Sequence, residues 1–390
     1  MRLLLPVLLL TCSVFAQSKQ KFEVSLFVNS KLADRYIYIR YQYSACDGGA
    51  TVDSEYVSSN KVVFKGAICQ PVPAQIFIPR KLPSPIVDLI SSNPFFEVSD
   101  MNFADSYQFF LMPGETIITA NNFLDESVIS GSSAVLDFEL FKKEADSIDS
   151  NVIIFYKKAL ACVKANDIEC AKENEAKLYN EESKMREKYL KYAENNPNSP
   201  LAFYALKNAL PTKVDSPEVY LNLLLKLSAE VKKYPEAIMF RNLFEGALNF
   251  HIGMSVPEFC QFDALGNAIS FNQYKNKFVL LYFWNSSSSS SLSIHENIFT
   301  LWEKYKNYNF TIAAIGLETL ESKDRWMKLI KQYKTPWSQL TDFRGMYNKA
   351  AQQFGVLNLP CYILINQGGQ IIFKDSSMKK IDQVLSGAMK

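Results

Sequence analysis

Histidine is scarce in this sequence, because the 390 residues include only His251 and His295. The two lie far apart, and no Cys-x-x-Cys or His-x-x-x-His spacing accompanies them. Structural and catalytic zinc sites are built from closely spaced cysteine and histidine ligands. We therefore expect no bound metal, and nothing else in the sequence points to a cofactor.

An excess of basic charge is also absent. The 42 lysines and arginines are nearly balanced by 40 aspartates and glutamates, and no basic stripe stands out. Proteins that bind nucleic acid carry a basic patch that contacts the phosphate backbone. Nucleic acid is therefore not an expected partner.

Long apolar runs are confined to the N-terminus. Residues 1–16 combine one positive charge at Arg2 with an apolar stretch and small residues that suit cleavage before Gln17, which is typical of a secretory signal peptide. A lipoprotein anchor at Cys12 is the alternative, although Thr11 stands where a smaller residue is usual. No later run reaches the ~20 residues of a membrane helix. We expect a protein exported to the periplasm or cell envelope, with no transmembrane segment in the mature chain.

Cysteines are few but even in number once the signal peptide is removed. Of seven cysteines, Cys12 leaves with the signal, and six remain in a compartment that permits disulfides. Cys162 and Cys170 flank KANDIE, which looks like the tip of a helical hairpin, so we favour a disulfide there. Cys46 and Cys69 flank strand-like segments, and they are either a second disulfide or two buried thiols.

The hydrophobic pattern divides the mature chain into three regions. Residues 17–133 alternate with period two between turn residues, as in KVVFKGAI, which predicts an all-β domain. Residues 134–250 have a helical period and dense charge on one face, which predicts a helical linker region. Residues 251–390 alternate short strands such as FVLLYFW with helices such as SLSIHENIFTLWEKYK, which predicts an α/β domain.

Most of the chain resembles a known family. The stretches VPEFCQFDALGNAISFNQYKNKFVLLYFW and GVLNLPCYILIN resemble the thioredoxin-like domain of TlpA/ResA-type thiol:disulfide interchange proteins. In the first region, TVDSEYV, FKGAI, LMPGETI and ISGS resemble a β domain of unknown function that often precedes such a domain in exported bacterial proteins. The resemblance implies a thioredoxin fold and a role in thiol–disulfide exchange.

The sequence departs from that family at the reactive site. Counted from Trp284, the family's two cysteines fall on Ser288 and Ser291. A helix N-terminus lowers the pKa of a cysteine thiol, and the resulting thiolate attacks a disulfide. A serine hydroxyl stays protonated at neutral pH and forms no such bond. The acids that handle protons in the family would fall on Tyr282 and Ile294, so we expect no catalytic residue here.

The scaffold around the missing dithiol remains. Leu359-Pro360 matches the family's cis-proline loop, which in relatives faces the dithiol and pairs with a substrate peptide. The resemblance therefore implies a groove that retains peptide, protein or anion binding, lined by Trp284, Ser288, Ser291, Leu359 and Pro360. The serines themselves suit helix N-capping or anion binding at the helix end.

Other interpretations stay open at this stage. Cys361, immediately after Pro360, could carry thiol–disulfide oxidoreductase activity, alone or with Cys260. Serine hydrolysis would require His295 as a base for Ser291, but no orienting acid is identifiable, and we expect His295 to lie on the helix surface. The third possibility is a structural envelope component in which the β domain binds the partner. The oligomeric state is not predicted.

Overall fold

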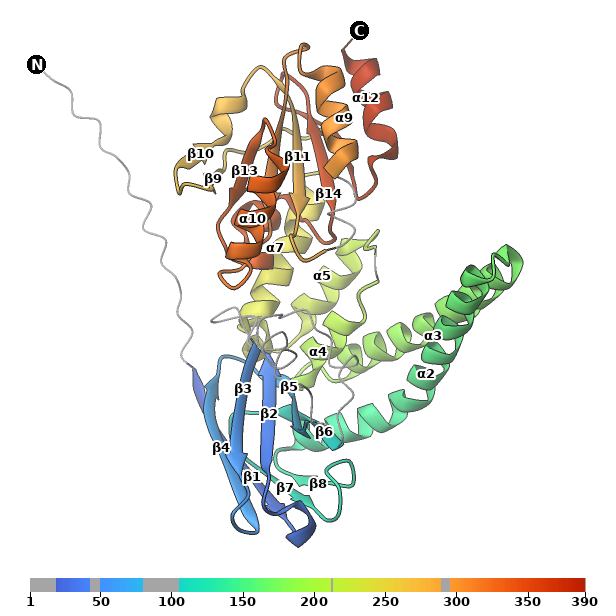
Figure 1. The fold of residues 1–390 in the computed structure, drawn as a ribbon, viewed down its shortest axis with the longest axis vertical. Helices are drawn as coiled ribbons and strands as arrows, with labels where there is room; N and C mark the ends of the chain where they lie inside the picture. The colour runs from blue at the N-terminus through green and yellow to red at the C-terminus, as the bar shows by residue number, and fades with distance from the viewer. Residues whose placement is uncertain (1–18, 43–49, 80–104, 212, 289–294, 390) are drawn as a thin grey trace, which may run out of the picture.

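The protein consists of three regions arranged along one long axis. The computed structural model describes residues 19–42, 50–79, 105–211, 213–288 and 295–389. A sheet-rich N-terminal region and a C-terminal α/β domain lie at opposite ends, with helices between them (Figure 1). This arrangement confirms the predicted multidomain fold class.

The N-terminal region packs two four-stranded sheets face to face. One sheet has the order β4-β1-β7-β8 and the other β3-β2-β5-β6. Alternate residues of each strand, such as Val24, Leu26, Ile39 and Phe109, form the core between the sheets, as period-two alternation requires. The strands are β1 (Gln20–Val28), β2 (Tyr36–Gln42), β3 (Ala50–Tyr56), β4 (Lys61–Ile68), β5 (Val72–Ile78), β6 (Asp105–Leu111), β7 (Gly114–Ala120) and β8 (Val128–Ser130).

The middle region is helical, and two of its helices form a projecting arm (Figure 1). A disulfide joins Cys162 to Cys170 at the tip of this arm, with 5.7 Å between the Cα atoms. Cys69 is also disulfide-bonded, whereas Cys46 lies outside the described residues. The helices are α2 (Ser133–Lys164), α3 (Ile168–Asn195), α4 (Leu201–Asn208), α5 (Pro217–Lys226), α6 (Ala229–Lys232) and α7 (Pro235–Asn249).

Helix α7 touches both of the other regions. At its first turn, Gln70 of the β region donates from Nε2 to Glu236 Oε2 at 2.7 Å and accepts from the Glu236 backbone N–H at 3.2 Å. Lys207 of α4 donates to the same carboxylate at 2.9 Å. At its last turns, Gly246 lies directly against the backbone of residues 352–355 in the C-terminal domain. The helix is therefore the structural link between the two ends of the molecule.

The C-terminal domain is a seven-stranded sheet with helices on both faces. Its strand order is β10-β9-β13-β12-β11-β14-β15. The strands are β9 (Cys260–Asp263), β10 (Ala268–Ser270), β11 (Phe278–Trp284), β12 (Phe310–Gly316), β13 (Ser338–Thr341), β14 (Cys361–Ile365) and β15 (Ile371–Asp375). The helices are α9 (His295–Tyr305), α10 (Lys323–Tyr333), α11 (Lys349–Phe354) and α12 (Ile381–Ala388), with short 3₁₀ turns η3 (Phe271–Tyr274), η4 (Gly345–Tyr347) and η5 (Met378–Lys380).

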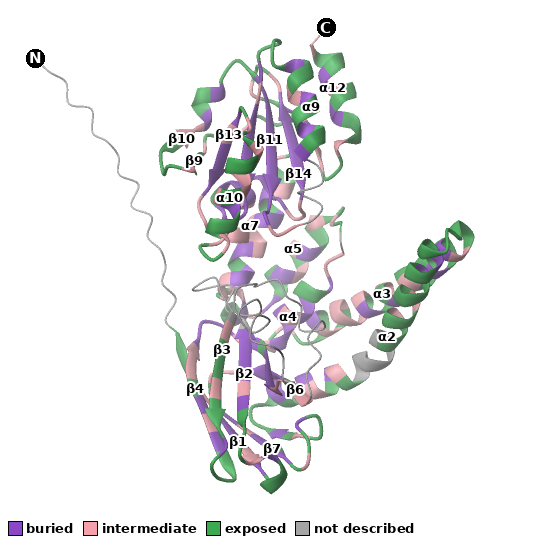
Figure 2. Ribbon diagram, viewed as in Figure 1, coloured by how far each residue is buried: buried purple, intermediate pink, exposed green. Residues whose placement is uncertain are grey.

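Both faces of this sheet carry an apolar core. Helices α9, α10 and α12 cover one face, where they pack against Leu280 and Tyr282 of β11. Helix α11 and the turn η3 cover the other face, where they pack against Leu281 and Phe283 of β11. Every residue of β11 is consequently buried (Figure 2), as expected for a strand covered on both sides. Within the described residues, no helix combines the length and apolarity needed to cross a membrane.

Candidate functional site

The candidate site lies where β11, β12 and β14 meet at one edge of the sheet. β11 pairs in parallel with β12, and Trp284 is opposite Gly316. β11 also pairs antiparallel with β14, and Phe283 is opposite Cys361. Continuing this register places Pro360 beside the end of β11. The sheet therefore brings the start of the serine run and the proline loop together, as the family resemblance implies.

The chain leaves β11 through a tight turn that Asn285 organises. The Asn285 Oδ1 atom accepts from the Ser287 N–H at 2.8 Å, and its backbone oxygen accepts from the Ser288 N–H at 3.2 Å. Its Nδ2 atom donates to the Leu317 carbonyl at 2.7 Å. Such side-chain-to-backbone bonds are the usual reason for Asn in turns. Ser288 is half-buried at the end of this turn, and Ser291 lies outside the described residues.

The buried carboxyl group of Glu318 also holds this turn, and Glu318 was not among the site residues predicted from the sequence. Its side chain is 0% exposed. It accepts from the Ser286 N–H at 2.6 Å, from Ser286 Oγ at 2.8 Å and from Ser322 Oγ at 2.7 Å. Burial raises the pKa of the Glu318 carboxyl above its ordinary range. A glutamate directly after the apolar run FTIAAIGL was the available signal, because a charged residue there follows a buried strand.

The proline loop presents little side chain to solvent. The Leu359–Pro360 peptide bond is cis, Leu359 is half-buried, and Pro360 is buried. Trp284, an expected binding residue, is 0% exposed and stacks on Tyr282 at 6.2 Å between ring centroids. Its side chain therefore belongs to the core. Among the expected binding residues that the structure describes, Ser288 and Leu359 are the two whose side chains are partly exposed.

Cys361 is a buried free thiol. Desolvation by burial raises its pKa to about 12, so the thiol stays protonated at neutral pH. Cys260 is also free but exposed. It lies on β9, four strand positions from β14 in the sheet, which is roughly 19 Å at about 4.8 Å per strand. This separation excludes a Cys260–Cys361 bond in this fold, because a disulfide requires Cα atoms within about 7 Å.

The expectation that His295 lies on the surface is wrong. His295 begins α9 and is 4% exposed. Its ring lies 4.0 Å from the Tyr333 ring and 5.6 Å from the Trp284 ring between centroids. Neither ring nitrogen has a hydrogen-bond partner among the described residues, and burial lowers its pKa to about 4. The aromatic side chains of β11 and α10 close over the first turn of α9, and they exclude water from this histidine.

The remaining predictions about the site fall partly outside the described residues. Ile294 and the proposed signal peptide, including Cys12, lie outside them. Within the described part of the chain, no group of three or more histidine, cysteine, aspartate or glutamate side chains could hold a metal ion. The described part of the site therefore includes the hydroxyls of Ser286, Ser287 and Ser288, the buried Glu318 carboxyl and the Cys361 thiol. It also includes the Arg325 guanidinium, which donates to Ser287 Oγ at 2.6 Å.

The fold and this site define a thioredoxin-like domain. Residues 276–371 match the family model described as thioredoxin-like. The thiol-disulfide oxidoreductase ResA of Bacillus cereus is 27% identical over 134 residues, which cover 34% of this chain and 75% of that protein. ResA of Bacillus thuringiensis matches to the same extent. The C-terminal domain is thus homologous to ResA-type thiol-disulfide oxidoreductases.

Solved structures with related names match about a third of the chain. A thiol-disulfide oxidoreductase from Bacteroides fragilis is 28% identical, with a TM-score of 0.32, and the match covers 34% of this chain and 98% of that one. The thioredoxin domain of a thiol-disulfide oxidoreductase from Bacteroides vulgatus is 22% identical, with a TM-score of 0.33, and the match covers 36% and 99%.

Proposed function

We propose that this protein is an exported thioredoxin-like binding protein whose own disulfide-exchange chemistry has been lost. The observation that carries the proposal is the serine at position 288, where the turn after β11 would present the attacking thiolate of an active relative. A hydroxyl at this position cannot form the mixed disulfide through which exchange proceeds.

Cys361, the free cysteine beside the proline loop, does not replace the missing thiolate. Cys361 is 7% exposed, and its pKa of about 12 leaves almost no thiolate at neutral pH. A nucleophilic cysteine needs the opposite environment, partly exposed and electropositive. This supports a site that binds without catalysing exchange.

The surface at this edge suits a peptide or protein client. Asn285 and Glu318 fix the turn that carries Ser288, and β14 fixes the adjacent loop at Leu359. A rigid turn beside a half-buried apolar side chain offers backbone pairing and a small apolar contact at low entropic cost. We propose that a client in the periplasm or cell envelope binds here.

Disulfide exchange by the purified mature chain tests the proposal. We expect no acceleration of insulin reduction by dithiothreitol above the uncatalysed rate. The matched control is the double variant Ser288→Cys and Ser291→Cys, which restores both sulfurs and should gain measurable exchange. The proposal would be contradicted if the unaltered chain catalysed exchange and the Cys361→Ser variant catalysed it as well.

Alkylation of the two free cysteines tests whether Cys361 acts as a thiolate. With iodoacetamide at neutral pH, we expect Cys260 to react readily because it is exposed, and Cys361 to react far more slowly because it is buried and protonated. Peptide mass spectrometry of each site against time measures both rates in one sample. Faster labelling of Cys361 than of Cys260 would favour an oxidoreductase working through Cys361.

A further inference from the structure

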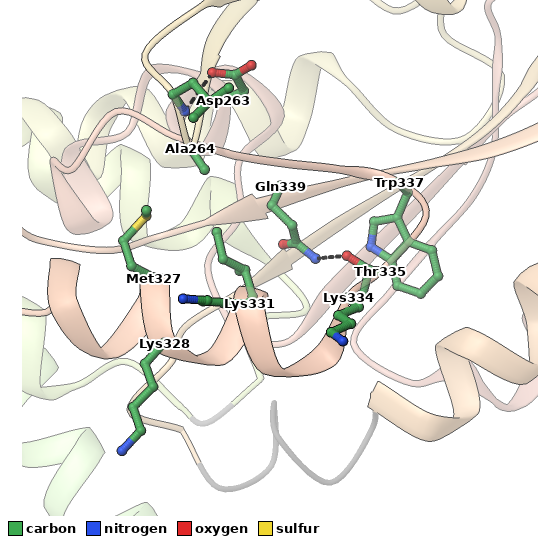
Figure 3. Close-up of a pocket in the computed structure, with 11 residues that line it drawn as sticks. Asp263, Ala264, Met327, Lys328, Lys331, Lys334, Thr335, Trp337 and Gln339 are labelled. Carbon is green, nitrogen blue, oxygen red and sulfur yellow. Dashed lines mark hydrogen bonds between the residues drawn. The ribbon is translucent and has the colours of Figure 1, made fainter.

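A second surface feature, separate from the site at the end of β11, lies between α10 and the turn after β9. It is a groove of about 690 Å³. Its apolar lining comes from Met327 and Ile330 on α10 and from Leu265 at the turn, and Leu265 is 85% exposed. In Figure 3 the side chains of Met327, Lys331 and Gln339 lie around the same hollow.

One wall of the groove is positively charged. Lys328, Lys331 and Lys334 all line it, and their spacing of three residues places them along one face of α10 and its C-terminal end. None of them forms an ion pair with a described residue. Like charges on successive turns of one helix repel one another, so an anionic ligand would stabilise them.

Among the described residues that line the groove, the one acid is Asp263, and the turn after β9 already uses its carboxylate. Asp263 accepts from the Leu265 N–H at 2.9 Å, from the Asn267 N–H at 2.8 Å and from Asn267 Nδ2 at 3.0 Å. The hydrogen bonds from Asn267 hold the pKa of the Asp263 carboxyl below its usual range. The described lining residues therefore carry three lysines against one aspartate and a net positive charge.

Two buried polar groups of the lining lack partners among the described residues. They are Trp337 Nε1, a donor, and Gln339 Oε1, an acceptor. Both side chains are more than nine-tenths buried, and Gln339 is oriented by a bond from its Nε2 atom to Thr335 Oγ1 at 2.9 Å. Buried polar groups are nearly always satisfied by some partner. A ligand in the groove that has both an acceptor and a donor could form hydrogen bonds with both groups.

We propose that this groove binds an extended acidic peptide that carries large apolar residues. A peptide backbone offers a carbonyl to Trp337 and an N–H to Gln339. Its carboxylates would pair with the lysines of α10, and an apolar side chain would cover Met327 and Leu265. An inorganic anion lacks the apolar surface that would cover Met327 and Leu265. The groove uses β9, α10 and β13, so this proposal does not rest on the function proposed for the end of β11.

Fluorescence anisotropy with the full-length protein tests the proposal. The probe is a short fluorescein-labelled peptide in which glutamate alternates with phenylalanine, and the matched probe has glutamine in place of glutamate. We expect saturable binding of the acidic probe and at least about tenfold weaker binding of the neutral one, because the neutral probe loses its pairs with the lysines. Equal binding of the two probes, or no binding of the acidic probe, would overturn the proposal.

Variants on α10 locate the binding surface. The double variant Lys328→Glu and Lys331→Glu should weaken binding by about tenfold or more, whereas Lys323→Glu, on the same helix but outside the lining, should leave it unchanged. Trp337→Phe keeps an aromatic ring and removes the donor, so we expect about threefold to tenfold weaker binding. The proposal fails if the double variant binds as the unaltered chain does, if inorganic phosphate displaces the probe at equal concentration, or if vesicles of anionic phospholipid are bound and the peptide is not.

Discussion

A Gly246→Ala variant is expected to lose about 3 kcal/mol of unfolding free energy in the C-terminal domain, because the new methyl group has no space. Gly246 lies in α7, and a Cβ atom built there would come within 2.7 Å of both the Gln353 carbonyl oxygen and the Gly355 backbone nitrogen. These are backbone atoms at the end of α11, and they cannot move aside as a flexible side chain could. Gly355 itself has a φ of +61°, which few other residues adopt without strain.

Intrinsic tryptophan fluorescence during urea denaturation measures this effect, since all four tryptophans lie in the C-terminal domain. Gly387→Ala is the matched control. Gly387 is also helical, but a Cβ atom there meets nothing within 4 Å, so alanine should stabilise by up to about 1 kcal/mol. A Gly246→Ala protein with an unchanged midpoint would show that α7 is not packed on α11 in solution.

Acidification from pH 7 to pH 4 is expected to destabilise the protein through His295 by about 3 kcal/mol. The pKa of the buried imidazole is lowered from 6.5 to about 4, so the unfolded chain takes up a proton at a pH where the folded chain does not. The loss begins as the pH falls through 6.5 and levels off below about pH 4, where the folded state is protonated as well. Above pH 7 the imidazole is neutral in both states and contributes no pH dependence.

The measurement compares the unfolding free energy against pH for the unaltered chain and for His295→Phe. Phenylalanine suits the surrounding rings, and it should remove the His295 component of the slope between pH 6.5 and 4. His251→Phe is the matched histidine-to-phenylalanine control at an exposed position. If His295→Phe and the unaltered chain lose stability in parallel on acidification, His295 is not buried as a neutral group.

The fold was largely predictable because its elements depend on local patterns. KVVFKGAI and FVLLYFW correspond residue for residue to β4 and β11, since alternation and an unbroken apolar run are signatures of one-sided and two-sided burial. Pro235 begins α7, and proline is common at the first position of a helix. These signals are carried by neighbouring residues, so no tertiary information is needed to interpret them.

The candidate site was harder to predict because its side chains are assembled from distant segments. Glu318 binds Ser286 across 32 residues of sequence, and His295 is covered by Tyr333 of another helix. Sequence spacing could only relate His295 to the adjacent serines, and it therefore placed the ring at the surface. The groove likewise depends on the meeting of Leu265 and α10, which no periodicity encodes.

Helix α7 has a mechanical consequence for the whole molecule. Its 15 residues span about 22 Å, and it is bonded near one end to Gln70 and wedged near the other against Gly355. A helix held at both ends resists bending, so we expect the two end regions of the molecule to rotate together. The two end regions are therefore expected to keep a fixed distance and orientation relative to each other.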